Sequence, residues 1–294
     1  MPADVTITRE IAPLPERKPD AHKGDAGRVV VIGGSCGEVM MVGAPAMTAS
    51  AAFRTGSGLV QLFVPEALRA PVAVLSPCAT IRTLPAGSEA LLAAIDEFRA
   101  DAVAVGPGLG RSIEPPVLVD LLKSHSGAMV IDADGLNLLA ETDPFDIPAP
   151  NRIVLTPHLG ELNRLLAARG MARKVTRDPA SRRDAACALV EAYGCTVVFK
   201  GRGTIVTNGD RLYVNETGNV GMATAGTGDV LTGILASLMG EAMPAFEASI
   251  LGVYLHGLAG DFAAEELGRR SLTATDVIDY LPEALCDHSA LANE

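Results

Sequence analysis

The chain has 294 residues, of which 48% are hydrophobic, and it carries a formal net charge of −11. This apolar content is sufficient for one large α/β domain, whereas the acidic balance and the lack of a basic run exclude an extended nucleic-acid surface. No apolar run reaches about 18 residues and the N-terminus lacks the apolar core of an export signal, so we expect a cytoplasmic protein without membrane contacts.

The predicted elements alternate along the chain between short β-branched runs and longer stretches rich in Ala and Leu. Several strand runs are continuously apolar, which is typical of strands covered by helices on both faces. This alternation predicts βαβ units in a three-layer αβα sandwich with a mostly parallel central sheet. Strands are expected at residues 28–32, 59–64, 101–105, 128–131, 152–155 and 196–199, and helices at 43–55, 88–99, 115–124, 159–168 and 179–193.

The last third of the chain has a different pattern. Asn208-Gly209 separates two short β runs at residues 204–207 and 211–214. This dipeptide between two β runs predicts a hairpin, which would add an antiparallel pair to the sheet. Three further helices are expected to begin near Val230, Ala245 and Thr275.

No internal repeat, low-complexity tract or long polar linker divides the chain. We therefore expect a single domain over residues 22–288, with an N-terminal extension at 1–21 and a C-terminal tail at 289–294. The five cysteines are far apart, odd in number and without a CxxC pair. Reduced thiols in the core are expected rather than disulfides or a zinc site.

Glycines, carboxylates and one lysine directly follow five of the expected strands. In an open α/β sheet, ligands bind beyond the carboxyl ends of the strands, so these five segments are expected to meet at one edge of the sheet. They are GGSCGE (33–38), GPGLGRS (106–112), DADGLN (132–137), TPHLGE (156–161) and KGRGT (200–204).

Each of these segments also has an interpretation without a ligand. GPGLG at 106–110 can be a tight turn and Lys200 a solvated charge. Asp132, Asp134 and His158 can cap the helices that follow them. The two common nucleotide motifs are missing from the sequence, because GGSCG lacks the G-x-G-x-x-G spacing and GxxxxGK[ST] does not occur. The convergence of all five segments nevertheless favours a shared ligand site.

The segment GMATAGTGDVLTG at residues 221–233 leads into a helix through a glycine-rich turn. A helix N-terminus carries unpaired N–H groups and a partial positive charge, so this entry is suited to an anion, although a simple helix cap is the alternative. The segment resembles the GTGD signature of the ribokinase-like superfamily, whose amides form an anion hole and whose Asp acts on the substrate hydroxyl.

Within that superfamily the chain is similar, from about His22 to Leu285, to the ADP-dependent (S)-NAD(P)H-hydrate dehydratases. The resemblance implies a ribokinase-like domain with hydro-lyase activity. Its substrates would be ADP and (6S)-NADHX or (6S)-NADPHX, the hydrated forms of NADH and NADPH, and its products NAD(P)H, AMP and phosphate. The segments that carry it are HKGDAGRVVVIGGS, GAPAMTASAAFRTGSGLV, VGPGLG, VIDADGLNLLA, LTPHLGELNRLL, FKGRGTIVTNG and the GTGD helix.

The resemblance also implies roles for individual residues. Asp229 would be the general base that takes the proton of the attacking hydroxyl. Gly226, Thr227 and Gly228 would form the anion hole around the transferred phosphoryl group. The nucleotide would bind at Lys200, Gly201, Arg202, Gly203, Thr204 and Gly228, and the hydrated dinucleotide at Ala44, Gly106, Gly108, His158 and Asp229.

Magnesium is expected with an ADP phosphoryl donor, and Asn137 and Glu161 are the candidate ligands. Family analogy implies a homotetramer. An epimerase that interconverts the two hydrates is expected as a separate functional partner, because only about 20 residues precede the core. On the helix that contains His256 and Asp261, we expect a buried histidine bonded within the helical layer rather than a metal ligand.

Two alternative functions stay open at this point. The first is an ATP-dependent small-molecule kinase of the same superfamily, such as one that acts on a vitamin precursor, whose product would be a stable phosphomonoester. The second is a non-catalytic dinucleotide-binding protein, which would not need a general base such as Asp229.

Overall fold

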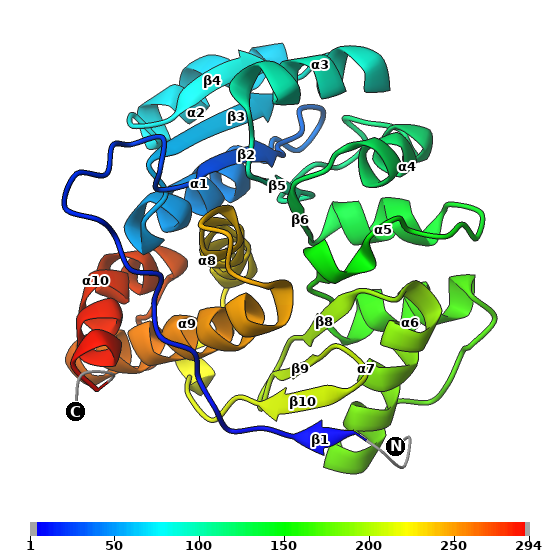
Figure 1. The fold of residues 1–294 in the computed structure, drawn as a ribbon, viewed down its shortest axis with the longest axis vertical. Helices are drawn as coiled ribbons and strands as arrows, with labels where there is room; N and C mark the ends of the chain where they lie inside the picture. Colours follow the sequence, from blue (N-terminus) through cyan, green and yellow to red (C-terminus); the bar gives the residue numbers. More distant parts are fainter. Residues whose placement is uncertain (1–4, 292–294) are drawn as a thin grey trace.

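The structure is a computed structural model, and it describes residues 5–291. Within this range, ten strands form one sheet in the order β1-β10-β9-β8-β7-β6-β5-β2-β3-β4, with helices on both faces (Figure 1). Neighbouring strands run parallel except for the pairs β8–β9 and β9–β10. The predicted αβα sandwich, with a mostly parallel sheet and an antiparallel hairpin, is therefore confirmed. The ends of the expected extension and tail, residues 1–4 and 292–294, lie outside the described residues.

Eight of the ten strands match a predicted strand to within one residue at each end. The other two, β1 and β4, form the two edges of the sheet. They were not predicted because β1 has two residues and the TIRT sequence of β4 has no apolar run. The strands are β1 (Thr6–Ile7), β2 (Arg28–Ile32), β3 (Leu59–Val64), β4 (Thr80–Thr83), β5 (Ala102–Val105), β6 (Ala128–Ile131), β7 (Ile153–Leu155), β8 (Thr196–Phe199), β9 (Ile205–Thr207) and β10 (Arg211–Val214).

The helices also follow the sequence pattern closely. The seven-residue helices α2 and α5 were not predicted, and α10 includes residues 289–291 of the expected tail. Three short 3-10 helices lie at Glu66–Leu68, Pro150–Arg152 and Val220–Met222. The α-helices are α1 (Gly43–Thr55), α2 (Arg69–Leu75), α3 (Ser88–Phe98), α4 (Pro115–Ser124), α5 (Asp134–Ala140), α6 (Leu159–Ala168), α7 (Pro179–Tyr193), α8 (Thr227–Gly240), α9 (Ala245–Leu267) and α10 (Ala274–Leu291).

A hydrophobic core lies on each face of the sheet. In β2, Val29 and Val31 belong to the core under α1, α8, α9 and α10, whereas Val30 and Ile32 belong to the core under α3 to α7. This alternation explains why the strand is apolar at every position. Helix α8 packs between α1, α9 and the sheet, and every residue from 230 to 240 is buried. Its N-terminus is therefore held in a fixed position against the strand ends.

The N-terminal segment crosses the molecule from β1 to β2 and is tied to the domain along its length (Figure 1). Strand β1 pairs in parallel with β10, and the backbone carbonyl of Ala12 lies 3.0 Å from Nε2 of His288. Arg17 donates to the carbonyl of Gly56 and lies 3.4 Å from the carboxylate of Glu241. These contacts bind the expected extension to α1, α8 and α10.

All five cysteines are free thiols, as expected. Cys187 and Cys195 are buried, but Cys36, Cys78 and Cys286 are exposed, so the expectation of core thiols is wrong for these three. In the part of the chain that the structure describes, no helix combines the length and the apolar character that a bilayer span requires.

Candidate active site

The five polar segments follow five strands that are direct neighbours in the sheet. These strands stand in the order β8-β7-β6-β5-β2 and all run parallel, so their carboxyl ends meet at one edge. Hydrogen bonds join the segments to one another: Gly34 N–H donates to Pro107 O, and Gly110 N–H donates to the Asp134 carboxylate. The structure therefore brings together the segments that the sequence singled out.

The N-terminus of α8 enters this edge without a cap. The N-cap residue Gly226 has a φ of +93°, and a Cβ there would lie 2.6 Å from Cε of Met47, so only glycine fits. Among residues 5–291, no side chain caps the first turn of α8. The hydroxyl of Thr227 donates to the carbonyls of Met222 and Thr224, away from these amides. Residues 226–228, here called the α8 tip, thus leave N–H groups for an anion.

Lys200, at the end of β8, lies directly against the α8 tip. A Cβ built on Gly228 would be 3.4 Å from Nζ of Lys200. Burial opposes protonation of Lys200, yet the charges of Asp132 and Glu161 outweigh it and raise the pKa of the ammonium group. A lasting positive charge and a set of helix amides therefore share one small region, which suits a phosphate group.

Asp229 lies in the first turn of α8 and is half-buried. Burial raises the pKa of its carboxyl group to about 7, with a further increase from Asp132 and an opposing effect of Lys200. None of the described residues forms a hydrogen bond or an ion pair with this carboxylate, while the backbone carbonyl of Asp229 accepts from the Thr48 hydroxyl at 3.1 Å. A general base works best with a pKa near the working pH, and Asp229 meets this condition.

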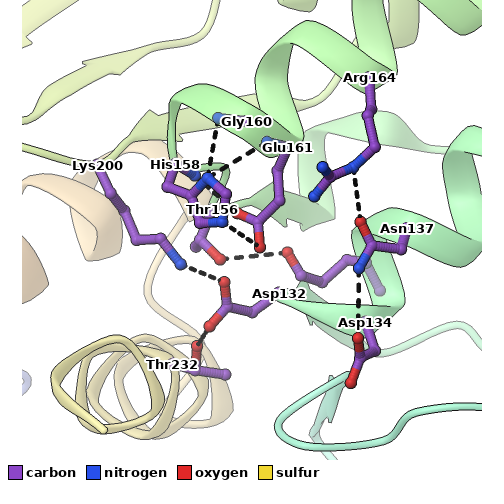
Figure 2. Close-up of polar contacts among 11 residues, drawn as sticks. Asp132, Asp134, Asn137, Thr156, His158, Gly160, Glu161, Arg164, Lys200 and Thr232 are labelled. Atoms are coloured by element: carbon purple, nitrogen blue, oxygen red, sulfur yellow. Dashed lines mark hydrogen bonds and ion pairs between the residues drawn. The ribbon is translucent and has the colours of Figure 1, made fainter. Parts of the chain in front are cut away.

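Asp132 is buried beneath Lys200, with 1% of its surface exposed. One carboxylate oxygen is 2.5 Å from Nζ of Lys200, and the other accepts from the Thr232 hydroxyl at 2.7 Å (Figure 2). The alternative in which Asp132 or Asp134 caps a helix is wrong, because Ala133 is the N-cap of α5 and no side chain of the described residues bonds there. The carboxylate of Asp134 instead accepts from Gly110 N–H at 2.7 Å.

His158 is the N-cap of α6, so the capping alternative is confirmed (Figure 2). Its Nδ1 accepts from the backbone N–H of Gly160 at 2.9 Å and of Glu161 at 3.3 Å, and the Glu161 carboxylate accepts from His158 N–H at 2.7 Å. Because Nδ1 is an acceptor, the neutral ring carries its proton on Nε2. Burial, and then the charge of Lys200, lower the pKa of His158 and keep the ring neutral. More than half of the side chain is exposed, so a capping histidine can still contact a ligand.

Glu161 is buried in the first turn of α6. Burial raises the pKa of its carboxyl group to about 7, although the charge of Lys200 opposes this. Asn137, the other candidate metal ligand, is engaged elsewhere: its amide oxygen accepts from Nε of Arg164 at 3.0 Å, and its amide nitrogen donates to Asp134 at 3.3 Å (Figure 2). Among the described residues, no three or more His, Cys, Asp or Glu side chains form a metal-binding group.

The predicted nucleotide loop, residues 201–204, connects β8 to β9 and is half-buried to exposed. The Thr204 hydroxyl closes the loop by donating to the carbonyl of Gly201 at 2.9 Å. Arg182 of α7 donates to the carbonyl of Arg202 and stacks over the Phe199 ring at 4.7 Å. Arg182 was not predicted, because nothing in the sequence of α7 indicates that its second turn faces this loop.

Of the five residues predicted to contact the hydrated dinucleotide, His158 and Asp229 have exposed surface, whereas the other three are covered. Ala44, Gly106 and Gly108 are buried. A Cβ on Gly108 would be 2.8 Å from that of Met41 and 3.0 Å from that of Ala44. These positions therefore adjoin one another under the segment that precedes α1. Beside them, a groove of about 640 Å³ runs between the 106–112 loop, α5 and α6, and it borders Asp134 and Asn137.

Asp261 of α9 anchors the loop that leads to the GMAT segment. Its carboxylate accepts from Gly218 N–H at 2.7 Å and from the Asn219 amide at 2.9 Å. His256, on the same helix, is half-buried, and desolvation of its ring lowers the pKa to about 4. A hydrogen bond with the Thr227 backbone opposes this decrease, but among the described residues Nε2 has no hydrogen-bond partner, so the expected bonding within the helical layer is met only in part.

Comparison with known proteins finds relatives along most of the chain. A family model described as NAD(P)H-hydrate dehydratase matches residues 29–283. The ADP-dependent (S)-NAD(P)H-hydrate dehydratase of Neisseria meningitidis is 40% identical, over 86% of this chain and 82% of its own. The chain spans about half the length of the first curated relatives it matches, which are bifunctional NAD(P)H-hydrate repair enzymes.

Two solved structures share the fold. A ribokinase-like superfamily protein of Enterococcus faecalis has a TM-score of 0.77 and 26% identity, and the match covers 94% of this chain and 92% of that one. The ADP/ATP-dependent NAD(P)H-hydrate dehydratase of Bacillus subtilis, co-crystallised with ATP and Mg²⁺, has a TM-score of 0.76 and 26% identity over 94% and 95% of the two chains. The ribokinase-like fold expected from the GTGD segment is confirmed.

Proposed function

Because this chain belongs to the NAD(P)H-hydrate dehydratase family, we propose that it dehydrates (6S)-NADHX or (6S)-NADPHX with ADP as the phosphoryl donor. The products are NADH or NADPH, AMP and phosphate. One observation carries the proposal: the uncapped α8 tip lies against the ammonium group of Lys200, and Asp229 stands in the same turn with a raised pKa. A phosphoryl group can be held there next to a base.

In the proposed reaction, Asp229 takes the proton of the C6 hydroxyl as this oxygen attacks the β-phosphorus of ADP. The bond between the β-phosphorus and the bridging oxygen breaks, and AMP leaves. The phosphate ester on C6 is then a good leaving group, whereas hydroxide is a poor one. Phosphate departs with the oxygen of the former hydroxyl, a proton leaves the neighbouring carbon, and the ring double bond is restored.

The α8 tip and Lys200 act on the charge that develops during transfer. Amides that are fixed before the reaction stabilise the transferring phosphoryl group without reorganising. In phosphoryl transfer, positioning and electrostatic stabilisation account for most of catalysis. Loop 201–204 is proposed to hold the rest of the nucleotide, since Arg182 and Thr204 fix its shape.

Magnesium is proposed as a partner of the ADP phosphates. Mg²⁺ prefers oxygen ligands and is commonly held by one or two carboxylates together with substrate phosphates. Glu161 supplies a carboxylate near Lys200, but one of its oxygens accepts from His158 N–H and the other lies 3.3 Å from His158 Nε2, so it would have to release His158 to bind the ion. Asn137 does not fit in this conformation, because its amide oxygen already accepts from Arg164. When bound, the ion would neutralise phosphate charge.

The first prediction concerns Asp229. Asp229→Asn keeps the side-chain shape but removes the proton acceptor, so kcat should fall by about 100-fold or more while ADP still binds. The measurement is recovery of reduced-nicotinamide absorbance from enzymatically hydrated NADH with ADP and Mg²⁺. Asp279→Asn, an exposed aspartate on α10, is the matched control and should keep full activity.

Other outcomes of this assay would identify a different function. A small-molecule kinase would convert its substrate to a stable phosphomonoester and would not restore absorbance. A non-catalytic binding protein would bind the hydrate without releasing phosphate. Full activity of Asp229→Asn would show that another group is the base. Preference for ADP over ATP, the tetramer, an epimerase as functional partner and the cytoplasmic location stay predictions.

A further inference from the structure

Asp132 has no role in the reaction as proposed above, yet its carboxylate joins three elements of the site. It follows β6, contacts Lys200 at the end of β8 and accepts from Thr232 in α8 (Figure 2). Both carboxylate oxygens are engaged, and both partners are themselves largely buried. The carboxylate of Asp134 is also held at both oxygens, by Gly110 N–H and by the Asn137 amide, but neither of these partners carries a charge.

The backbone around Asp132 is also constrained. The next residue, Ala133, has φ 48° and ψ −119°, a conformation that alanine rarely adopts. On the other side, a Cβ on Gly106 would lie 1.8 Å from the carbonyl oxygen of Asp132. Neighbouring structure thus fixes this carboxylate at the cost of backbone strain. Strain of this kind is concentrated at functional sites.

A purely structural role explains these features poorly. A buried ion pair is weak evidence for stability, because the loss of hydration offsets the attraction between the charges. Lys200 also has a choice of partners, since Glu161 and Asp229 attract it as well. An ammonium group drawn to Asp229 would neutralise the base. Asp132 instead holds it 3.4 Å from the Cβ position of Gly228.

We propose that Asp132 is a positioning residue, which holds the Lys200 ammonium beside the α8 tip and so leaves the Asp229 carboxylate free. Thr232 fixes the orientation of the Asp132 carboxylate. This inference rests on the proposed function, because it assigns Lys200 to the phosphate of the nucleotide. Asp132 holds the phosphate-binding group in place through Lys200, and its charge also raises the pKa of Asp229.

Asp132→Asn tests the proposal, because it keeps the shape and an acceptor for Thr232 but removes the charge. The Kd of ADP, measured by calorimetry, and the KM of ADP should rise by about 10-fold to 100-fold. The acidic limb of the kcat/KM profile should move to lower pH, since the charge of Asp132 no longer opposes ionisation of Asp229. ADP binding that is unchanged or tighter would overturn the proposal, because it would mean that Asp132 merely offsets the charge of Lys200.

A double-mutant cycle separates positioning from a general folding defect. In the Lys200→Gln background, Asp132→Asn should have no further effect on ADP affinity. Thr232→Val should weaken ADP binding in the same direction as Asp132→Asn, and Thr232→Ser should restore it. Thr55→Val is the matched control, because it removes a buried hydroxyl that bonds only to Ala51 O in α1. Additive losses, or equal losses in Thr55→Val and Thr232→Val, would contradict the positioning role.

These measurements also distinguish this inference from the proposed function. Wild-type protein that binds ADP but does not restore NADH would contradict the proposed function, and the ADP affinities would still decide the role of Asp132. Wild-type protein that binds no ADP would contradict both. Circular dichroism of each variant shows whether it is folded.

Discussion

Burial raises the pKa of the Asp229 and Glu161 carboxyl groups to about 7. Both carboxylates lie close enough to Lys200 to raise the pKa of its ammonium group. An ionised carboxylate in such a place is unfavourable for folding, because burial removes water from the charge. A base with a pKa near 7 is favourable for proton transfer at neutral pH. The site therefore exchanges stability for reactivity at these two positions.

The direction of the pKa shift of Asp229 predicts how its carboxyl group changes the stability of the protein with pH. Its pKa is about 7 in the folded protein and lower when unfolded, so the carboxyl group binds a proton more tightly in the folded state. Its contribution to stability is full near pH 4 and is lost as the pH rises through about 7. Asp229→Asn should therefore be more stable than wild type at pH 8, by on the order of 2 kcal/mol, and equally stable near pH 4.

Thermal unfolding followed by circular dichroism at both pH values provides the measurement. The Asp279→Asn control should unfold like wild type at each pH, because its carboxylate is exposed. A variant of Asp229 that is less stable than wild type at pH 8 would mean that the ionised carboxylate stabilises the fold.

At the scale of the element, α6 and α8 satisfy their N-termini in opposite ways. His158 and Glu161 form a capping box that occupies the amides of α6. In α8 the N-cap is Gly226, and the hydroxyl of Thr227 bonds to the preceding loop. A capped helix cannot offer the same amides to a phosphate. The difference marks α8 rather than α6 as the anion-binding helix.

His158 caps α6 and also exposes its ring to the site, and this leads to a prediction about α6. His158→Ala removes the cap and should lower the free energy of unfolding by about 1 kcal/mol. His158→Ser restores an N-cap acceptor, so it should recover most of this stability. If the ring also contacts the hydrated dinucleotide, His158→Ser should keep a raised KM for that substrate while its Tm returns towards wild type.

Chemical denaturation gives the stability of both variants, and steady-state kinetics give the KM. Recovery of both stability and KM in His158→Ser would show that the histidine serves only as a cap. A KM that stays raised would support the role that the family resemblance implies.

At the scale of the whole molecule, the N-terminal segment stabilises the framework that positions the site. It adds β1 to the sheet edge and packs Ile11 and Leu14 against the core that contains α8. Arg17 connects it to α1 and to Glu241 at the end of α8. The far end of the helix that carries Asp229 is thus held by a segment distant from the site.

Removal of residues 1–21 should therefore destabilise the protein. The lost apolar contacts of Val5, Ile11 and Leu14 are worth about 3 kcal/mol together, which corresponds to a decrease in Tm of several degrees. Differential scanning calorimetry of the shortened and full chains measures the effect. An unchanged Tm would show that the segment adds nothing to the stability of the domain.

Local patterns predicted the elements of the central sheet because strand and helix periodicity follow from burial on one or both faces. Edge strands such as β4 were not predicted, because a partly buried strand has no continuous apolar run. The same logic placed Lys200 at a strand end and Asp229 at a helix start. For Asp132 it offered a helix cap as the alternative to a ligand site, because Asp is favoured at helix N-caps.

The sequence alone determined the αβα class, the family, and the two residues on which the proposed chemistry depends. The tertiary structure alone decided that Asp132 pairs with Lys200, 68 residues away, and with Thr232, 100 residues away. The reason is physical: local sequence sets which element forms, whereas contacts between side chains of distant segments depend on strand order and on how α8 packs against the sheet. No local pattern contains that information.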